Sequence, residues 1–305
     1  DYITNHPKTN INQLKEIYGR LSKSSQELVL VAGYPGIGKT ALVQEIRPLI
    51  RKTGGFFVKG KYDQFEENRP YVAWILALTD LANQFLILGD EELQEISSRI
   101  MNAIGNNGRV ITDFVPDLEK VIGKQPKIPD AGGIEARNRF NYVLQRFIGA
   151  VATEKHPLVI FLDDLQWADD ASLDLLETLY ANPGIPFFLV IGAFRDNEVD
   201  DYHPLRKKIS VLFKSGIKIT NITLKKLERS SLDRMLSEIF HTTREDIIPL
   251  SSLILSKTDG NILFVRQVLS SLVSQEAITF QQSPNGGTGR SGRLSRQKSQ
   301  IMWWR

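Results

Sequence analysis

The chain contains 305 residues, and its 42% apolar and 24% charged composition is typical of a soluble globular protein with a hydrophobic core. The absence of cysteine excludes disulfides, thiolate metal sites and cysteine nucleophiles, and the four histidines are too scattered to form a recognisable metal motif. No apolar run approaches transmembrane length and the first residues do not resemble a signal peptide, so we expect a cytoplasmic protein without membrane contacts.

The net charge of +3 is distributed unevenly along the chain. Residues 281–305 contain five basic and no acidic side chains, which leaves 33 basic and 35 acidic side chains in the remainder. Because non-specific binding to nucleic acids depends on a basic surface, this nearly neutral main part argues against a nucleic-acid partner.

The first predicted element is a polar leading segment, 1–17, in which Ile11, Leu14 and Ile17 have the spacing of one helix face. It leads into Tyr18-Gly19-Arg20. An uninterrupted apolar run over 28–32 then predicts a buried strand.

A glycine-rich loop follows that strand. Residues 33–40 read GYPGIGKT and match the pattern G-x-x-x-x-G-K-[ST], which indicates a phosphate-binding loop rather than an ordinary glycine turn. Its glycines let the backbone turn its N–H groups toward phosphate oxygens, and the helix predicted after it directs its positive end at the anion. We expect Lys39 to contact the β- and γ-phosphates and Thr40 to bind Mg²⁺. The residues predicted to bind nucleotide here are Gly33, Pro35, Gly36, Ile37, Gly38, Lys39, Thr40 and Ala41.

The next elements are predicted from hydrophobic periodicity and from turn residues. A second strand is expected over 56–60, and helices are expected over 71–88 and 91–104. Glycine and asparagine residues break the pattern at 105–108, and a loop with two prolines is expected over 123–133.

A further helix is predicted over 134–151, with an apolar stripe on one face. Arg139 lies beside that stripe. A solvated charge or a local salt bridge is the favoured interpretation of this arginine, and contact with nucleotide or a neighbouring subunit is the alternative.

Two carboxylates follow a third strand, predicted over 158–162, that is apolar throughout. Acidic residues at the end of an apolar strand often have no functional role. Downstream of a phosphate-binding loop, however, they suit Mg²⁺-nucleotide chemistry. We expect Asp163 to hold the metal ion with Thr40, either directly or through water. Asp164 would orient or deprotonate the attacking water.

A fourth strand over 187–194 ends at Arg195, after a helix predicted over 171–180. If this strand lies between the first and third strands, Arg195 is level with the γ-phosphate and is a candidate sensor; a structural ion pair is the alternative. The predicted catalytic residues are therefore Asp164, Lys39 and Arg195.

The remainder is predicted as a fifth strand over 217–224 and a helical region over 230–278, which Ser230 or Ser231 could cap. From residue 281 the composition cannot bury enough apolar surface to fold. The ending Ile301-Met302-Trp303-Trp304 is unusual for such a tail and suggests a frameshift or truncation.

With these motifs in view, the chain resembles the AAA-type predicted ATPase domain, akin to the origin-recognition-like AAA group and to the signal-transduction ATPases with numerous domains. In bacteria this domain often lies between a Ser/Thr kinase domain and GAF and histidine kinase domains. The resemblance spans Tyr18 to about Ile278. Besides the phosphate-binding loop it rests on Tyr18-Gly19-Arg20, Gly60-Lys61-Tyr62-Asp63-Gln64, Asn138-Arg139-Phe140, Asp163-Asp164-Leu165-Gln166-Trp167-Ala168-Asp169, Arg195-Asp196-Asn197-Glu198 and Gly260-Asn261.

The resemblance implies that Asp163 and Asp164 form the Walker B pair and that Arg195 is the first sensor. It also implies that the adenine end is lined by Tyr18, Gly19 and Arg20. The family's lid usually reads Gly-Asn-Pro, with the proline touching the base, whereas this sequence has Ile262 at the third position. No H-R-D or D-F-G triplet occurs, so a kinase activity would belong to flanking domains.

The expected fold is an α/β P-loop NTPase with a parallel five-stranded sheet flanked by helices and a C-terminal helical lid. The expected domains are a core over 18–224, a lid over 225–280 and a disordered tail over 281–305.

The expected function is hydrolysis of ATP to ADP and phosphate with Mg²⁺, as a nucleotide-dependent switch in a larger signalling protein. The expected partners are flanking kinase or sensor domains, with nucleotide-dependent self-association. One alternative is a nucleotide-binding scaffold with negligible hydrolysis, suggested by Asp164 at a position where many AAA enzymes have glutamate. The other is a DNA-associated AAA ATPase.

Overall fold

The structure is a computed structural model that describes residues 8–21, 27–65, 70–129, 132–180, 185–275, 279–282 and 290–293. The chain divides into two compact units. The larger unit comprises 8–33 and 39–223, and the smaller one includes the loop segment 34–38 and the described residues from 224 onward.

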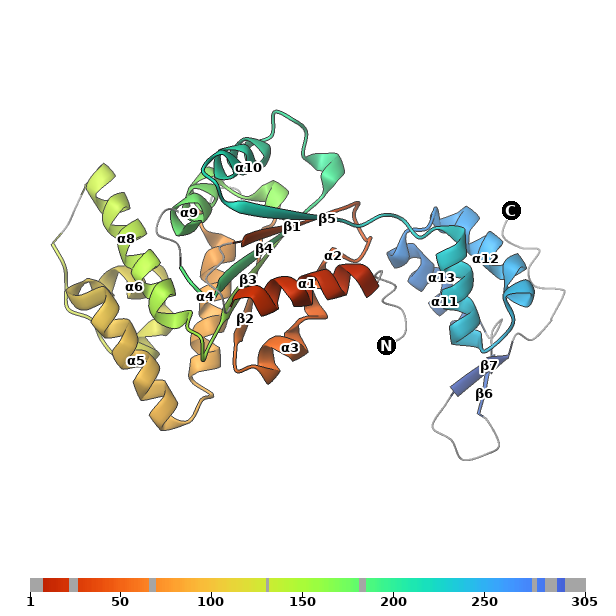
Figure 1. Cartoon of the computed structure of the whole chain (residues 1–305), viewed down its shortest axis with the longest axis horizontal. Coiled ribbons are helices and arrows are strands. Elements are labelled where there is room, and N and C mark those ends of the chain that lie inside the picture. Colours follow the sequence, from red (N-terminus) through yellow and green to blue (C-terminus); the bar gives the residue numbers. More distant parts are fainter. Residues whose placement is uncertain are drawn as a thin grey trace. The chain divides into compact units, whose positions relative to one another are not determined.

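A five-stranded parallel sheet is the centre of the larger unit, as the sequence predicts (Figure 1). Its strand order is β2-β3-β4-β1-β5. The strands are β1 (Glu27–Ala32), β2 (Phe56–Lys61), β3 (Leu158–Asp163), β4 (Phe188–Phe194) and β5 (Lys218–Thr223).

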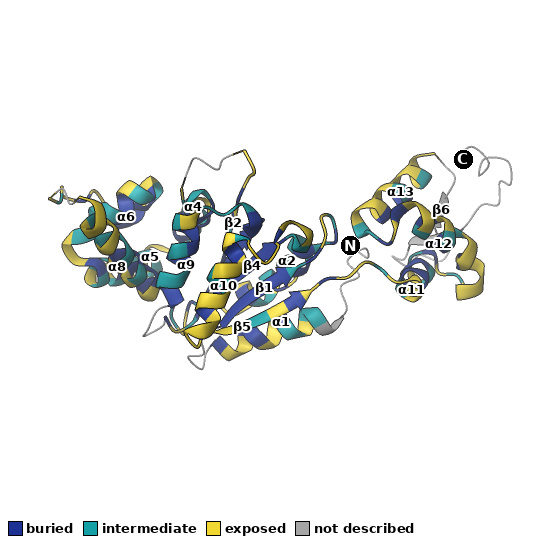
Figure 2. Ribbon diagram, turned by 90° about the horizontal axis from the view of Figure 1, so that it is seen from above, coloured by how far each residue is buried: buried dark blue, intermediate teal, exposed yellow. Residues whose placement is uncertain are grey.

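The three central strands are almost wholly buried, since helices cover both faces of the sheet (Figure 2). This explains why their sequences are continuous apolar runs rather than alternating ones. The edge strand β5 is mostly exposed or half-buried and contains lysine, threonine and asparagine.

Strand β4 lies between β3 and β1, which is the condition set for the Arg195 prediction and is confirmed by the strand order. In the register, Leu162 of β3 faces Gly192 of β4, and Phe194 faces Ala32 of β1. The residues that follow these three strands therefore meet at one edge of the sheet.

The helices of the larger unit bury apolar side chains. They are α1 (Lys8–Arg20), α2 (Lys39–Gln44), α3 (Arg47–Lys52), α4 (Val72–Phe85), α5 (Asp90–Ile104), α6 (Gly108–Phe114), α7 (Glu119–Ile122), α8 (Gly133–Val151), α9 (Asp170–Tyr180) and α10 (Pro204–Lys214). The buried apolar side chains of α4 to α10 belong to one continuous core with residues of the sheet. Helices α6 and α7 were not expected, because glycine and proline residues interrupt the periodicity on either side of them.

The smaller unit contains three helices in its described part: α11 (Arg229–Phe240), α12 (Arg244–Thr258) and α13 (Ile262–Ser274). Their apolar faces form a separate small core that includes Leu232, Leu236 and Ile254. The cap of α11 is Glu228, not the predicted Ser230 or Ser231, because the helix already begins at Arg229.

The tail predicted to be disordered over 281–305 lies largely outside the described residues. Within it the structure describes part of a short antiparallel pair, β6 (Thr279–Gln282) and β7 (Arg290–Arg293). No helix in the described part of the chain is long and apolar enough to span a bilayer.

Candidate functional site

The predicted phosphate-binding loop joins β1 to α2. Gly33, Gly36 and Gly38 have φ angles of 156°, 74° and 100°, and the last two lie in the left-handed region that side chains with a Cβ rarely adopt. The Ile37 N–H donates to the Tyr34 carbonyl over 3.3 Å, which closes a tight turn inside the loop. The glycine pattern of the sequence is therefore required by the backbone path.

Lys39 is the first residue of α2 and is largely buried at the foot of the loop. Its ammonium donates to the Gly33 carbonyl over 2.7 Å. Burial lowers the pKa of Lys39, the carboxylates of Asp164 and Asp163 act in the opposite direction, and Arg195 adds to the lowering. The lysine thus lies within the electrostatic field of both predicted acids and of the predicted sensor.

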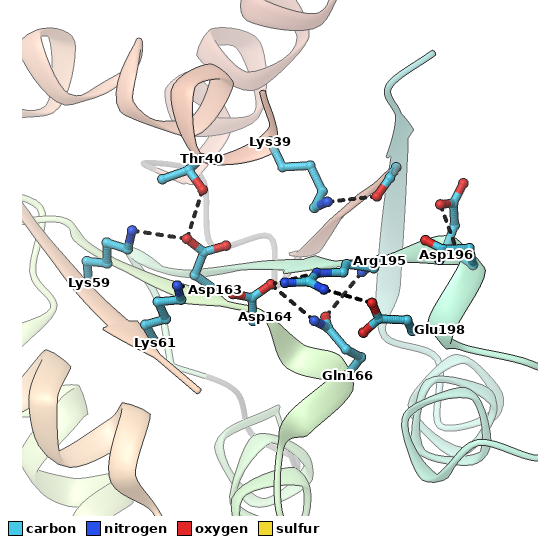
Figure 3. Close-up of polar contacts among 12 residues, drawn as sticks. Lys39, Thr40, Lys59, Lys61, Asp163, Asp164, Gln166, Arg195, Asp196 and Glu198 are labelled. Atoms are coloured by element: carbon cyan, nitrogen blue, oxygen red, sulfur yellow. Dashed lines mark hydrogen bonds and ion pairs between the residues drawn. The ribbon is translucent and has the colours of Figure 1, made fainter. Parts of the chain in front are cut away.

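Asp163, the last residue of β3, contacts Thr40, the last residue of the loop motif (Figure 3). Thr40 Oγ1 donates to Asp163 Oδ2 over 2.8 Å, and the Lys59 ammonium lies 3.0 Å from the same oxygen. Because Lys59 belongs to β2, three separate segments contribute to this contact.

Asp164 directly follows β3 and has φ 58° and ψ 46°, in the left-handed helical region. Aspartate and asparagine tolerate this conformation better than most other residues with a Cβ. Its carboxylate accepts a 3.1 Å hydrogen bond from Gln166 Nε2 and pairs with Arg195 Nε at 3.6 Å and with Lys61 at 3.4 Å.

Arg195 follows β4 and has three kinds of contact. Besides Asp164, it pairs with Glu198 at 2.8 Å, and its guanidinium lies 4.5 Å from the centre of the Trp167 ring. Its backbone N–H donates to Gln166 Oε1 over 3.2 Å. The ion pair that the sequence analysis gave as the alternative is therefore present, and contact of Arg195 with the γ-phosphate stays a prediction.

This network includes three further side chains to which the sequence analysis assigned no role. Gln166 bridges the ends of β3 and β4 through its amide, and Lys59 and Lys61 bring positive charge from β2. The signal that could have identified the lysines is their two-residue spacing at the carboxyl end of a strand, which places both side chains on one face.

Tyr18 and Arg20, which the resemblance places at the adenine end, have partners outside the network of Asp163 and Asp164. The Tyr18 hydroxyl hydrogen-bonds Thr53, and the Arg20 guanidinium pairs at 3.3 Å with Glu27, a carboxylate that is 1% exposed. Glu27 begins β1, whereas the phosphate-binding loop follows the opposite end of that strand. Arg20 and Tyr18 thus have partners at the amino edge of the sheet.

The middle of the loop has contacts within the smaller unit. Asn261 caps α13, because its side chain accepts from the Leu263 N–H, and its Nδ2 donates to the Pro35 carbonyl over 2.8 Å. The Leu263 N–H also lies 3.2 Å from the Gly36 carbonyl. Ile262, at the position of the family's proline, packs against the small core of helices α11, α12 and α13.

Thr40 and Asp163, the predicted metal ligands, offer oxygen donors that suit Mg²⁺. Thr40 Oγ1 and Asp163 Oδ2 are hard oxygen donors 2.8 Å apart. Within the described residues there is no cluster of three or more His, Cys, Asp or Glu side chains that could hold a metal ion by itself. Mg²⁺ in nucleotide sites usually takes one or two protein oxygens and completes its shell with phosphate and water, so this pair fits.

Comparison with known proteins shows that residues 8–191 match the family model of the AAA ATPase domain. The hybrid signal transduction histidine kinase G of Dictyostelium discoideum is 28% identical over 92% of this chain, which covers 10% of that protein. The chain thus spans about a tenth of that curated relative's length.

Two solved structures are also similar. The signal transduction ATPase with numerous domains PH0952 of Pyrococcus horikoshii, which has a tetratricopeptide repeat sensor, matches with a TM-score of 0.37 and 17% identity over 82% of this chain and 28% of its own. The ORC2 protein of Aeropyrum pernix matches with a TM-score of 0.48 and 14% identity over 89% of this chain and 63% of its own.

Proposed function

Since more than half of its residues match the family, the chain belongs to the AAA ATPase domain family, and we propose that it binds ATP with Mg²⁺ and hydrolyses it to ADP and phosphate. The observation that carries this proposal is the convergence of Lys39, Thr40, Asp163, Asp164 and Arg195 at the carboxyl edge of one sheet. Ligands of open parallel α/β sheets bind at this edge.

In the proposed reaction the loop N–H groups and Lys39 bind the phosphates, and Thr40 and Asp163 hold the metal ion. Bound Mg²⁺ would neutralise charge on the phosphate oxygens. Asp164 orients the attacking water or accepts its proton, and Arg195 contacts the γ-phosphate. Lys39 and Arg195 stabilise the negative charge that grows in the transition state.

The biological setting is proposed from the histidine kinase relative, whose printed name describes a signalling protein. A nucleotide-dependent switch inside a larger kinase-associated protein is consistent with a chain that spans a tenth of that relative. Flanking kinase or sensor domains would be its partners, and nucleotide state would control self-association.

The test is isothermal calorimetry with Mg·ATP, followed by steady-state phosphate release from the same preparation. We expect saturable binding and measurable turnover. Absence of any binding heat, supported by absence of ligand-induced thermal stabilisation, would remove the proposal.

A second candidate is a nucleotide-binding scaffold that hardly hydrolyses ATP. The observation in its favour is that Gln166, Lys61 and Arg195 all engage Asp164 in this structure. Tight binding without phosphate release, both for this chain and for a version with its native flanking domains, would select the scaffold over the enzyme.

A further inference from the structure

The Oδ2 oxygen of Asp163 contacts two side chains, those of Thr40 and Lys59. Thr40 Oγ1 donates to Oδ2 over 2.8 Å, and the Lys59 ammonium pairs with it at 3.0 Å. Only 7% of the Asp163 side chain is exposed. A buried carboxylate requires a compensating charge, and in this arrangement Lys59 supplies it.

Lys59 is held in place by its own strand and by an aromatic ring. In the parallel register Lys59 faces Phe161, and its ammonium lies 5.3 Å from the centre of that ring. Such a cation–π contact is favourable but modest. About a third of the Lys59 side chain is exposed, so the ammonium can move into water without a change in the backbone.

Lys61 is a second lysine of β2 with which Lys59 can be compared. It lies two residues further along β2, so it projects from the same face, and it pairs at 3.4 Å with Asp164 rather than with Asp163. More than half of the Lys61 side chain is exposed. The two lysines are therefore matched in type and strand but not in the carboxylate that they contact.

We propose that Lys59 is a positioning residue that occupies Asp163 in the metal-free protein and competes with Mg²⁺ for this carboxylate. The inference rests on the proposed function, because it takes Thr40 and Asp163 as the metal ligands. A Mg²⁺–oxygen bond is about 2.1 Å long, so an ammonium left in place would lie within about 5 Å of the ion. The two positive charges repel each other, so binding of the metal displaces Lys59 from Asp163.

Removal of the Lys59 charge should therefore raise the affinity for a divalent ion and lower the stability of the metal-free protein. A Lys59→Gln variant keeps a hydrogen-bond donor near Asp163 but removes the charge. It should bind a divalent ion more tightly, on the order of tenfold, because no ammonium has to be displaced. It should also unfold at a lower temperature in EDTA, because Asp163 then lacks its counter-ion, and this difference should shrink when Mg²⁺ and ADP are present.

The experiment titrates Mn²⁺ into the full chain saturated with ADP and follows free Mn²⁺ by electron paramagnetic resonance. Lys59→Gln should bind more tightly than the wild type, whereas Lys59→Arg, which keeps the charge, and Lys61→Gln should each stay close to it. Equal or weaker Mn²⁺ binding by Lys59→Gln would overturn the inference, because a purely structural lysine would orient Asp163 for the metal.

If Lys59→Gln does not fold, Phe161→Leu takes its place, since it removes the ring beside the ammonium and leaves every charge. It should also tighten Mn²⁺ binding, by a smaller factor, and unchanged or weaker binding would again contradict the inference. A wild-type protein that binds neither ADP nor Mn²⁺ would instead refute the proposed function, so the two failures are distinguishable.

Discussion

Thr40 and Asp163 are 123 residues apart in the sequence and are joined by a 2.8 Å hydrogen bond between the hydroxyl of one and the carboxylate of the other. Thr40 is the second residue of α2, and Asp163 ends β3, two strands away from β1 in the sheet. Their contact is the basis of the proposed metal site.

Lys39→Ala is expected to weaken Mg·ATP binding on the order of 100-fold, because a charge-assisted phosphate contact contributes about 3 kcal/mol. Calorimetry measures the dissociation constant, and Lys61→Ala serves as the control, since its exposed side chain pairs with Asp164 and not with the loop. Unchanged affinity in Lys39→Ala would place the phosphates elsewhere.

Asp164→Asn is expected to keep ATP binding and to lower turnover about 100-fold, because the amide cannot accept a proton from water. Asparagine tolerates the φ of 58° at this position, so the fold should be preserved. Phosphate release and binding are measured on the same sample. Normal turnover in the variant would show that Asp164 has no such role.

Gln166→Leu should reduce turnover about tenfold with little change in ATP affinity, because Asp164 and the Arg195 backbone both lose a hydrogen bond that fixes them. Gln84→Leu is the matched control. Its amide also donates to a strand, at the Phe57 carbonyl, without contacting the acids. An equal loss of activity in both variants would indicate a general effect on stability.

Gly60→Ala should destabilise the fold by about 2 kcal/mol or more, because a Cβ at this position would lie 1.9 Å from the Ala73 carbonyl oxygen and force β2 and α4 apart. The control is Gly149→Ala on the exposed side of α8, where a Cβ meets nothing within 4 Å. That change should stabilise the protein by about 0.5–1 kcal/mol. Urea denaturation measures both, and a stable Gly60→Ala would contradict this packing.

Arg20→Ala tests the adenine contact that the family resemblance implies. Because Arg20 pairs with Glu27 at the amino edge of the sheet, we expect lower thermal stability and an unchanged preference for ATP over GTP. Competition binding with the two nucleotides measures this preference. A shift in the ratio without loss of stability would instead support contact with the base.

The sequence alone determined the elements whose signals are local. The turn of the loop follows from the glycines at positions 33, 36 and 38, and the central strands follow from uninterrupted apolar runs, because backbone sterics and side-chain periodicity act over a few residues. Asp163 and Thr40 were predicted to hold one metal ion; the structure joins them by a hydrogen bond, and the metal site itself stays a prediction.

The tertiary structure decided what depends on contacts between distant segments. It placed β4 between β3 and β1, brought Lys59 and Lys61 from β2 onto the two acids, and directed Arg20 to Glu27 at the other edge. Strand order and charge pairing across strands are set by how separate elements pack, and this information is not contained in the periodicity of any one segment.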